Sequence, residues 1–174
     1  MASSWRNALA HEKNNKLLAA SACFLILAIA IYFSFFDILI PGLPDGSYRL
    51  AIGDLFLVPA IILAVGQSFI LGFALHASTA LFNAKKDFLK AIFISSLLTF
   101  LFSLTYVIFP FFGPFYYIVF AVGGPWYALP VEILWSAVTV SIGALLIRKF
   151  YGLDLKISYA ISLLVVAGIV VAAS

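Results

Sequence analysis

The chain has 174 residues, of which 65% are hydrophobic, 17% aromatic and only 10% charged, with a formal net charge of +3. A soluble globular domain is about half apolar and about a quarter charged, so this chain has too few polar residues for a water-facing surface. One Cys and ten Lys and Arg residues also exclude a disulfide-stapled domain and a nucleic-acid binder with a basic surface. The sequence therefore predicts an all-α integral membrane protein, a polytopic helical bundle.

Five apolar runs have the length of a membrane-spanning helix, which needs about 20 residues to cross a bilayer core of about 30 Å. We predict transmembrane helices at about residues 17–36, 55–81, 89–109, 131–147 and 157–173. Residues 1–16 are expected to form a cytoplasmic amphipathic segment ahead of a single transmembrane domain, residues 17–174. Asp54 is expected to cap the second span, because it directly precedes the apolar run that starts at Leu55.

The stretch from Pro110 to Pro130 has room for either a sixth span or a long connection. Lys and Arg collect on the cytoplasmic side of short loops. With five helices, the N-terminus inside and the C-terminus outside, nine of the ten basic residues are cytoplasmic and only Arg49 is not. We therefore predict that residues 110–130 form an aromatic, Pro- and Gly-rich outer loop or re-entrant segment between the third and fourth helices.

Small side chains recur every four residues along the second span and define one face of that helix. These positions are Ala60, Ala64, Ser68, Gly72 and His76. In lipid, helices associate through close packing of small residues, so this face is expected to meet another helix.

A stripe of polar residues is predicted on the third and fourth spans. Its members are Ser95, Thr99, Ser103, Glu132 and Ser136. Hydroxyl groups at such positions hydrogen-bond to their own backbone or to a neighbouring helix, which holds a bundle together. The alternative interpretation is a polar-lined path for a small neutral solute.

No residue pattern in the sequence indicates catalysis or a cofactor. His76 is the sole imidazole in a predicted span, and Cys23 and His11 lie too far from it in sequence to give a metal-ligand spacing. A nucleophile elbow, a phosphate-binding loop and a dinucleotide fingerprint are also absent. We therefore predict a protein that is not an enzyme and binds no cofactor or nucleic acid.

Basic residues at the predicted cytoplasmic ends of the helices indicate contacts with the anionic lipids of the inner leaflet. The candidates are Lys85, Lys86, Lys90, Arg148 and Lys149. Such contacts weaken at high salt because exposed charges are screened.

Two segments carry a resemblance to the Yip1 family of small polytopic membrane proteins. The stretch GFALHASTALFNAKKDFLKAIFIS, residues 72–95, is similar to that family's pair of helices joined by a short Gly-, Lys- and Phe-containing loop, with Asn83 and Ala84 in place of the glycine. The stretch ILWSAVTVSIGALLIRKFYGLDLKISYAISLLVV, residues 133–166, resembles its closing helix pair with a basic, Gly-containing turn. The order of five helices agrees with the family, and the chain looks like its prokaryotic members.

The resemblance implies a non-enzymatic scaffold or membrane-organising protein of a prokaryotic plasma membrane, which acts through helix–helix and lipid contacts. It also implies a protein partner or a homo-oligomer within the membrane. One alternative is an accessory subunit of a larger membrane complex, which would dock through the small-residue face and the aromatic outer loop. A second alternative is a small-solute transporter or channel built on the polar stripe.

Overall fold

A computed structural model describes residues 2–38, 46–82, 84, 87–111 and 129–173, with side chains described for residues 12–34, 57–82, 84, 87–104 and 133–168. These residues form five helices and no strand, which confirms the all-α prediction. The helices are α1 (Ala2–Ile38), α2 (Gly46–Leu81), α3 (Phe88–Phe111), α5 (Leu129–Tyr151) and α6 (Leu155–Ala173). The predicted outer loop, residues 112–128, lies outside the described residues.

Helices α1 and α2 are longer than the spans expected from the apolar runs. Helix α1 continues without a break from Ala2 to Ile38, and at 1.5 Å per residue it is about 55 Å long. Helix α2 begins at Gly46, so Asp54 lies inside the helix and the expectation that it caps the helix is wrong. No proline occurs between Pro44 and Pro59, and the backbone there keeps every N–H that a helix needs.

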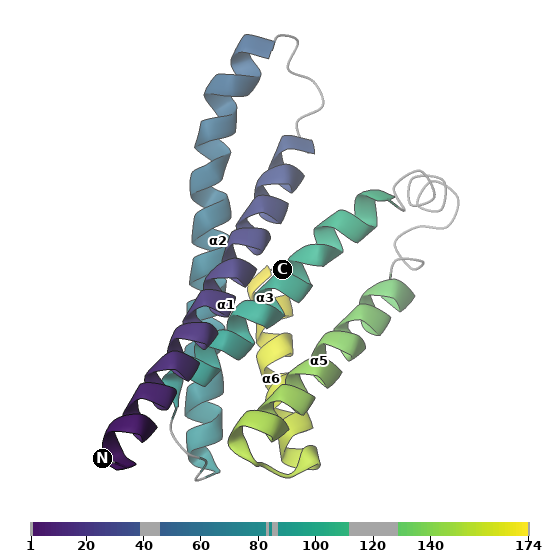
Figure 1. Cartoon of the computed structure of the whole chain (residues 1–174). Helices are drawn as coiled ribbons and strands as arrows, with labels where there is room; N and C mark the ends of the chain where they lie inside the picture. Colours follow the sequence, from purple (N-terminus) through teal and green to yellow (C-terminus); the bar gives the residue numbers. More distant parts are fainter. Residues whose placement is uncertain (1, 39–45, 83, 85–86, 112–128, 174) are drawn as a thin grey trace.

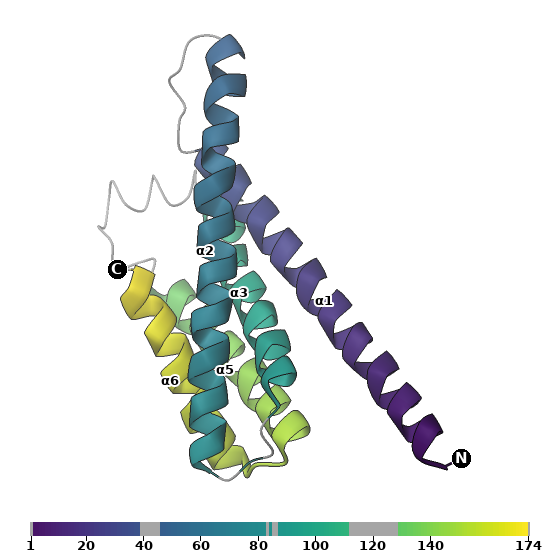
Figure 2. The same ribbon diagram turned by 90° about the vertical axis from the view of Figure 1, so that its left-hand side faces the viewer.

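Helices α2, α3, α5 and α6 form a ring, and α1 packs on the outside of this ring. Helix α3 packs against α2 and α5, and α6 completes the ring by packing against α5 and α2. Helix α1 contacts α2 and α3, and its N-terminal half leans away from the other helices (Figures 1 and 2). The start of α1, the α2–α3 turn and the α5–α6 turn lie at the same end of the molecule (Figure 1).

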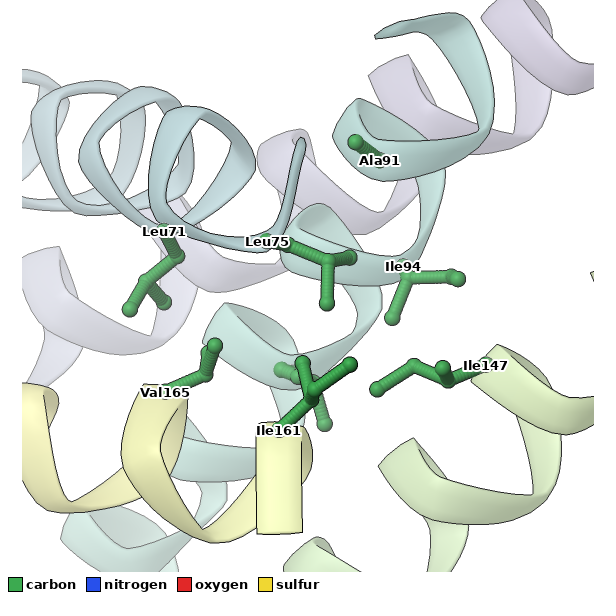
Figure 3. Packing of buried hydrophobic residues seen from close by; sticks show 8 residues of the cluster. Leu71, Leu75, Ala91, Ile94, Ile147, Ile161 and Val165 are labelled. Atoms are coloured by element: carbon green, nitrogen blue, oxygen red, sulfur yellow. The ribbon is translucent and has the colours of Figure 1, made fainter. Parts of the chain in front are cut away.

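Side chains from all four helices of the ring meet in an apolar core. Leu75 of α2, Ile94 of α3 and Ile147 of α5 point toward Ile161 of α6 (Figure 3), and each of them is at most 1% exposed. A smaller cluster forms where α1 crosses α2. Its buried members are Ala28, Tyr32, Ala60 and Ala64.

The outer surfaces of the helices are apolar, as expected for a protein embedded in lipid. Large side chains such as Ile62, Ile70 and Leu164 are 64%, 70% and 69% exposed. Within the described residues, three helices are long and apolar enough to cross a membrane, over Glu12–Ser34, Leu57–Leu81 and Ile133–Tyr151. These features support an integral membrane protein.

Candidate functional site

The small-residue face of α2 lies in contact with two different helices. Ala60 and Ala64 are fully buried in the cluster with α1, and Ser68 and Gly72 face α3. A Cβ atom added at Gly72 would lie 2.7 Å from Cδ1 of Ile92, which is closer than real Cβ atoms approach their neighbours. Gly72 therefore leaves the space that the end of the Ile92 side chain occupies between α2 and α3.

Three serine hydroxyls meet at the α2–α3 interface. The Oγ atom of Ser68 lies 3.3 Å from Oγ of Ser95 and 3.0 Å from Oγ of Ser96. Ser95 and Ser96 also donate to the backbone carbonyl of Ile92, at 2.9 and 2.7 Å. All three side chains are at most 1% exposed, so this cluster joins the two helices away from lipid.

The remaining members of the predicted polar stripe have different surroundings. Ser103 is fully buried and donates to the carbonyl of Phe100 at 2.8 Å, and Ser136 is half-buried. Thr99 is fully buried, and its hydroxyl has no hydrogen-bond partner among the described residues. The side chain of Glu132 lies outside the described residues, so the stripe is described on α3 and only in part on α5.

Helices α5 and α6 also approach closely at a glycine. Ser162 of α6 donates a hydrogen bond to the carbonyl of Val140 at 2.8 Å, so its hydroxyl lies against the backbone of α5. A Cβ atom added at Gly143 would overlap that same hydroxyl and would lie 3.4 Å from Cδ2 of Leu98. Gly143 thus leaves the space that the Ser162 hydroxyl occupies.

Two further hydrogen bonds cross between helices in the apolar part of the chain. The indole N–H of Trp135 on α5 donates to the carbonyl of Leu101 on α3 at 3.0 Å. The hydroxyl of Tyr32 on α1 donates to Oε1 of Gln67 on α2 at 2.8 Å. Such bonds each contribute about 1 kcal/mol or less between membrane helices, so several are needed to fix an arrangement.

His76 continues the small-residue face toward the end of α2. Its ring packs edge-on against Phe88 with the centroids 5.5 Å apart, and its Nδ1 atom is buried without a partner in the described part of the chain. The side chains described by the structure contain no group of three His, Cys, Asp or Glu residues that could hold a metal ion.

Asp87 organises the end of the molecule where the turns lie. Its carboxylate accepts a hydrogen bond from the backbone N–H of Lys90 at 3.3 Å and pairs with the Lys90 ammonium at 2.8 Å, which caps α3. Burial alone would raise the pKa of this carboxyl, but the hydrogen bonds and charge of Lys90 outweigh burial and hold the pKa below its ordinary value. The Tyr151 hydroxyl donates to the Asp87 carbonyl at 3.0 Å and so ties α5 to α3.

The α5–α6 turn is short because Gly152 ends α5 and Asp154 caps the start of α6. Gly152 has a φ of +69° and its N–H donates to the carbonyl of Arg148 at 2.9 Å, a backbone conformation that closes helix ends. The carboxylate of Asp154 then caps α6 by accepting from the backbone N–H of Lys156 at 3.4 Å, and its backbone carbonyl accepts from the N–H of Ser158 at 2.9 Å. The basic residues of this turn are thereby held at one end of the bundle.

The predicted lipid-contacting residues are not equivalent. Arg148 and Lys149 lie in the last turn of α5 and are exposed, as is Lys156 in the first turn of α6. The Lys90 side chain is 20% exposed and engaged with Asp87. Lys85 and Lys86 lie outside the described residues. We define the basic turn as Arg148, Lys149 and Lys156, which present their charges to the surroundings.

Several residues of these interfaces could not be singled out from the sequence. Ser96, Trp135 and Ser162 form contacts with residues that lie 22 to 34 positions away in the sequence, and only the three-dimensional pairing reveals them. The role of Asp87 had a local signal, because an Asp just before an apolar run is a favoured helix cap.

Comparison with known proteins adds no relative: no family model, no curated protein and no solved structure matches the chain. The arrangement must therefore be interpreted from its own chemistry. The described polar groups include hydroxyls, one amide, one indole and one imidazole set between packed helices. Such groups hold helices together and mediate contacts within a membrane.

Proposed function

We propose that the chain is a non-enzymatic integral membrane scaffold of the Yip1-like, prokaryotic type, which organises other membrane components through helix–helix and lipid contacts. The observation that carries the proposal is the placement of polar side chains between helices. Ser68, Ser96 and Ser162 are buried and hydrogen-bonded across or against a neighbouring helix. Close packing at Gly72 and Gly143 favours a solid bundle over a solute path.

The proposal includes five spans, with the N-terminus inside and the C-terminus outside a plasma membrane. Helices α3 and α6 would add two spans to the three long apolar helices, although their described apolar parts, Phe88–Leu104 and Leu155–Gly168, are shorter. The position of the basic turn at the same end as the start of α1 supports this topology (Figure 1), because basic residues collect on the cytoplasmic side.

Native mass spectrometry tests the scaffold function. The tagged chain is taken from its native membrane into lipid nanodiscs, and its mass and attached components are recorded. We expect the chain alone or as a homo-oligomer, with bound lipid and with other membrane proteins in variable, substoichiometric amounts. A complex of fixed stoichiometry with unrelated catalytic or transport subunits would contradict the scaffold and identify an accessory subunit.

Neutralising one exposed lysine of the basic turn is expected to weaken the preference for anionic lipid. A Lys or Arg residue near an anionic surface contributes about 1 kcal/mol, so Lys149→Gln should lower the binding of phosphatidylglycerol relative to phosphatidylcholine about fivefold. Lys90→Gln is the matched control, because the Lys90 charge is already paired with Asp87. The measurement is the composition of lipid that stays bound in nanodiscs of both lipids.

Salt gives an independent check of the same contact. High salt should reduce the preference of the wild-type chain by more than that of Lys149→Gln, because exposed charges are screened and the variant keeps only Arg148 and Lys156 of the basic turn. Equal effects of Lys149→Gln and Lys90→Gln, or a preference indifferent to salt, would contradict a lipid contact at the basic turn.

A further inference from the structure

Gln67 places an amide group near the middle of an apolar helix. It follows Leu57 by ten residues and precedes Leu81 by fourteen, so it lies about 15 Å and about 21 Å from the two ends of this apolar run. Its Oε1 atom accepts a hydrogen bond from Tyr32 at 2.8 Å. The residue is half-buried, and its Nε2 atom is not among the buried atoms without a partner, so the amide nitrogen reaches the outer surface of the chain.

The N–H groups of this amide require a further acceptor. In the described part of the chain, the hydrogen bond from Tyr32 is the one hydrogen bond of the Gln67 carboxamide, and it uses the oxygen. Lipid tails offer no acceptor, and an unsatisfied polar group in hydrocarbon costs several kcal/mol. A carboxamide both donates and accepts, so its open side fits a group of the same kind.

The helix surface beside Gln67 is shaped for close approach. Apart from the neighbouring residues and backbone of α2 itself, no heavy atom lies within 4 Å of a Cβ added at Gly66, so no packing contact within the described chain requires a glycine there. Glycine inside a helix costs about 1 kcal/mol relative to alanine. Ile62 and Ile70, one turn before and one turn after Gly66, are 64% and 70% exposed. Figure 2 looks onto α2, which no other helix covers from this side.

We infer that two copies of this chain pair through the outer face of α2, with the Gln67 amides hydrogen-bonded to each other beside Gly66. Two copies with the same membrane orientation are related by a twofold axis along the membrane normal. Such an axis places every residue at the same membrane depth as its counterpart in the other copy. Residues near the axis then contact their counterparts, so one Gln67 meets the other. The small Gly66 lets the two α2 helices approach. The inference rests on the proposed membrane scaffold and identifies its homotypic contact.

Cysteine crosslinking in lipid vesicles tests the pair. In a Cys23→Ala background, Ile70→Cys is compared with Leu164→Cys, because Ile70 and Leu164 are 70% and 69% exposed on α2 and α6. The purified chain is reconstituted in phosphatidylcholine vesicles and oxidised. We expect a disulfide-linked dimer for Ile70→Cys at a yield several times that for Leu164→Cys. Equal yields, or no dimer with either variant, would overturn the inference.

Second substitutions distinguish the loss of the Gln67 amide contact between copies from a general change in the fold of one chain. Gln67→Leu should weaken dimerisation roughly threefold to thirtyfold, the range for hydrogen bonds between membrane helices. Tyr32→Phe removes the same bond within the chain and should leave the crosslink yield unchanged. Gly66→Leu should also weaken the pair, whereas Gly168→Leu, at another glycine with open space around it, should not. Full crosslinking of the Gln67→Leu variant would overturn the inference.

The vesicles contain no other protein, so this result is separate from the scaffold function. A chain that stays monomeric in vesicles but binds other membrane proteins in its native membrane overturns the pair and leaves the scaffold. A chain that pairs through α2 but occurs in its native membrane as a fixed subunit of an enzyme supports the pair and overturns the scaffold.

Discussion

Replacing Gly143 by valine is expected to lower the free energy of unfolding by about 1 to 3 kcal/mol, the usual cost of overfilling a packed interface. The new side chain would overlap the Ser162 hydroxyl, which donates to the Val140 carbonyl at 2.8 Å. Ser162 can give way only by breaking that bond, or α6 must move away from α5. Unfolding by SDS in mixed micelles, followed by tryptophan fluorescence, measures the loss.

Gly168→Val is the matched control, because a Cβ added at Gly168 meets no atom within 4 Å. Both substitutions exchange a glycine in an apolar helix for the same β-branched residue, so their difference isolates the contacts at Gly143, with Ser162 of α6 and Leu98 of α3. A second variant, Gly143→Val with Ser162→Ala, should recover part of the stability by removing the overlapping hydroxyl. If Gly143→Val were no worse than Gly168→Val, the close approach of α5 and α6 would be refuted.

The helices themselves could be predicted because their cause is local. A run of about 20 apolar residues must form a helix in lipid, since only a helix satisfies its own backbone groups there. Each of the five predicted runs therefore lies within one of the helices α1, α2, α3, α5 and α6, although α1 and α2 extend well beyond their runs. The ends differ where this cause does not operate: residues 46–54 are mixed in polarity, so hydropathy does not indicate that α2 already begins at Gly46.

The sequence predicts which face of a helix is packed, but it does not predict which helix covers that face, because the pairing of helices is set by three-dimensional packing. The four-residue spacing of Ala60, Ala64, Ser68 and Gly72 indicates a packed face, but it does not indicate that α1 covers one part and α3 the other. The hydroxyl of Ser96 lies against Ser68 for the same reason. A single sequence carries no signal for that register, and it likewise gives no sign that α1 lies outside the ring.

Replacing Leu75 by alanine is expected to cost about 1 to 3 kcal/mol, and it tests the ring of four helices. Leu75 is fully buried among Ile94, Ile147 and Ile161 (Figure 3), so truncation leaves a cavity at the centre of the bundle. Soluble proteins lose about 2 to 5 kcal/mol in such a change, partly because the side chain returns to water on unfolding. In a bilayer the unfolded helix keeps its side chains in lipid, which is as apolar as leucine, so mainly the lost packing remains.

The contrast with a lipid-facing leucine makes this result decisive. Leu164 on α6 is 69% exposed, and Leu164→Ala exchanges contacts with lipid for other contacts with lipid. Its cost should stay within about 0.5 kcal/mol, as for substitutions away from packed features. Both variants are unfolded by SDS from the same micelles. Equal losses would mean that Leu75 is not enclosed by α3, α5 and α6, whereas a large loss at Leu75 alone requires that these helices enclose it.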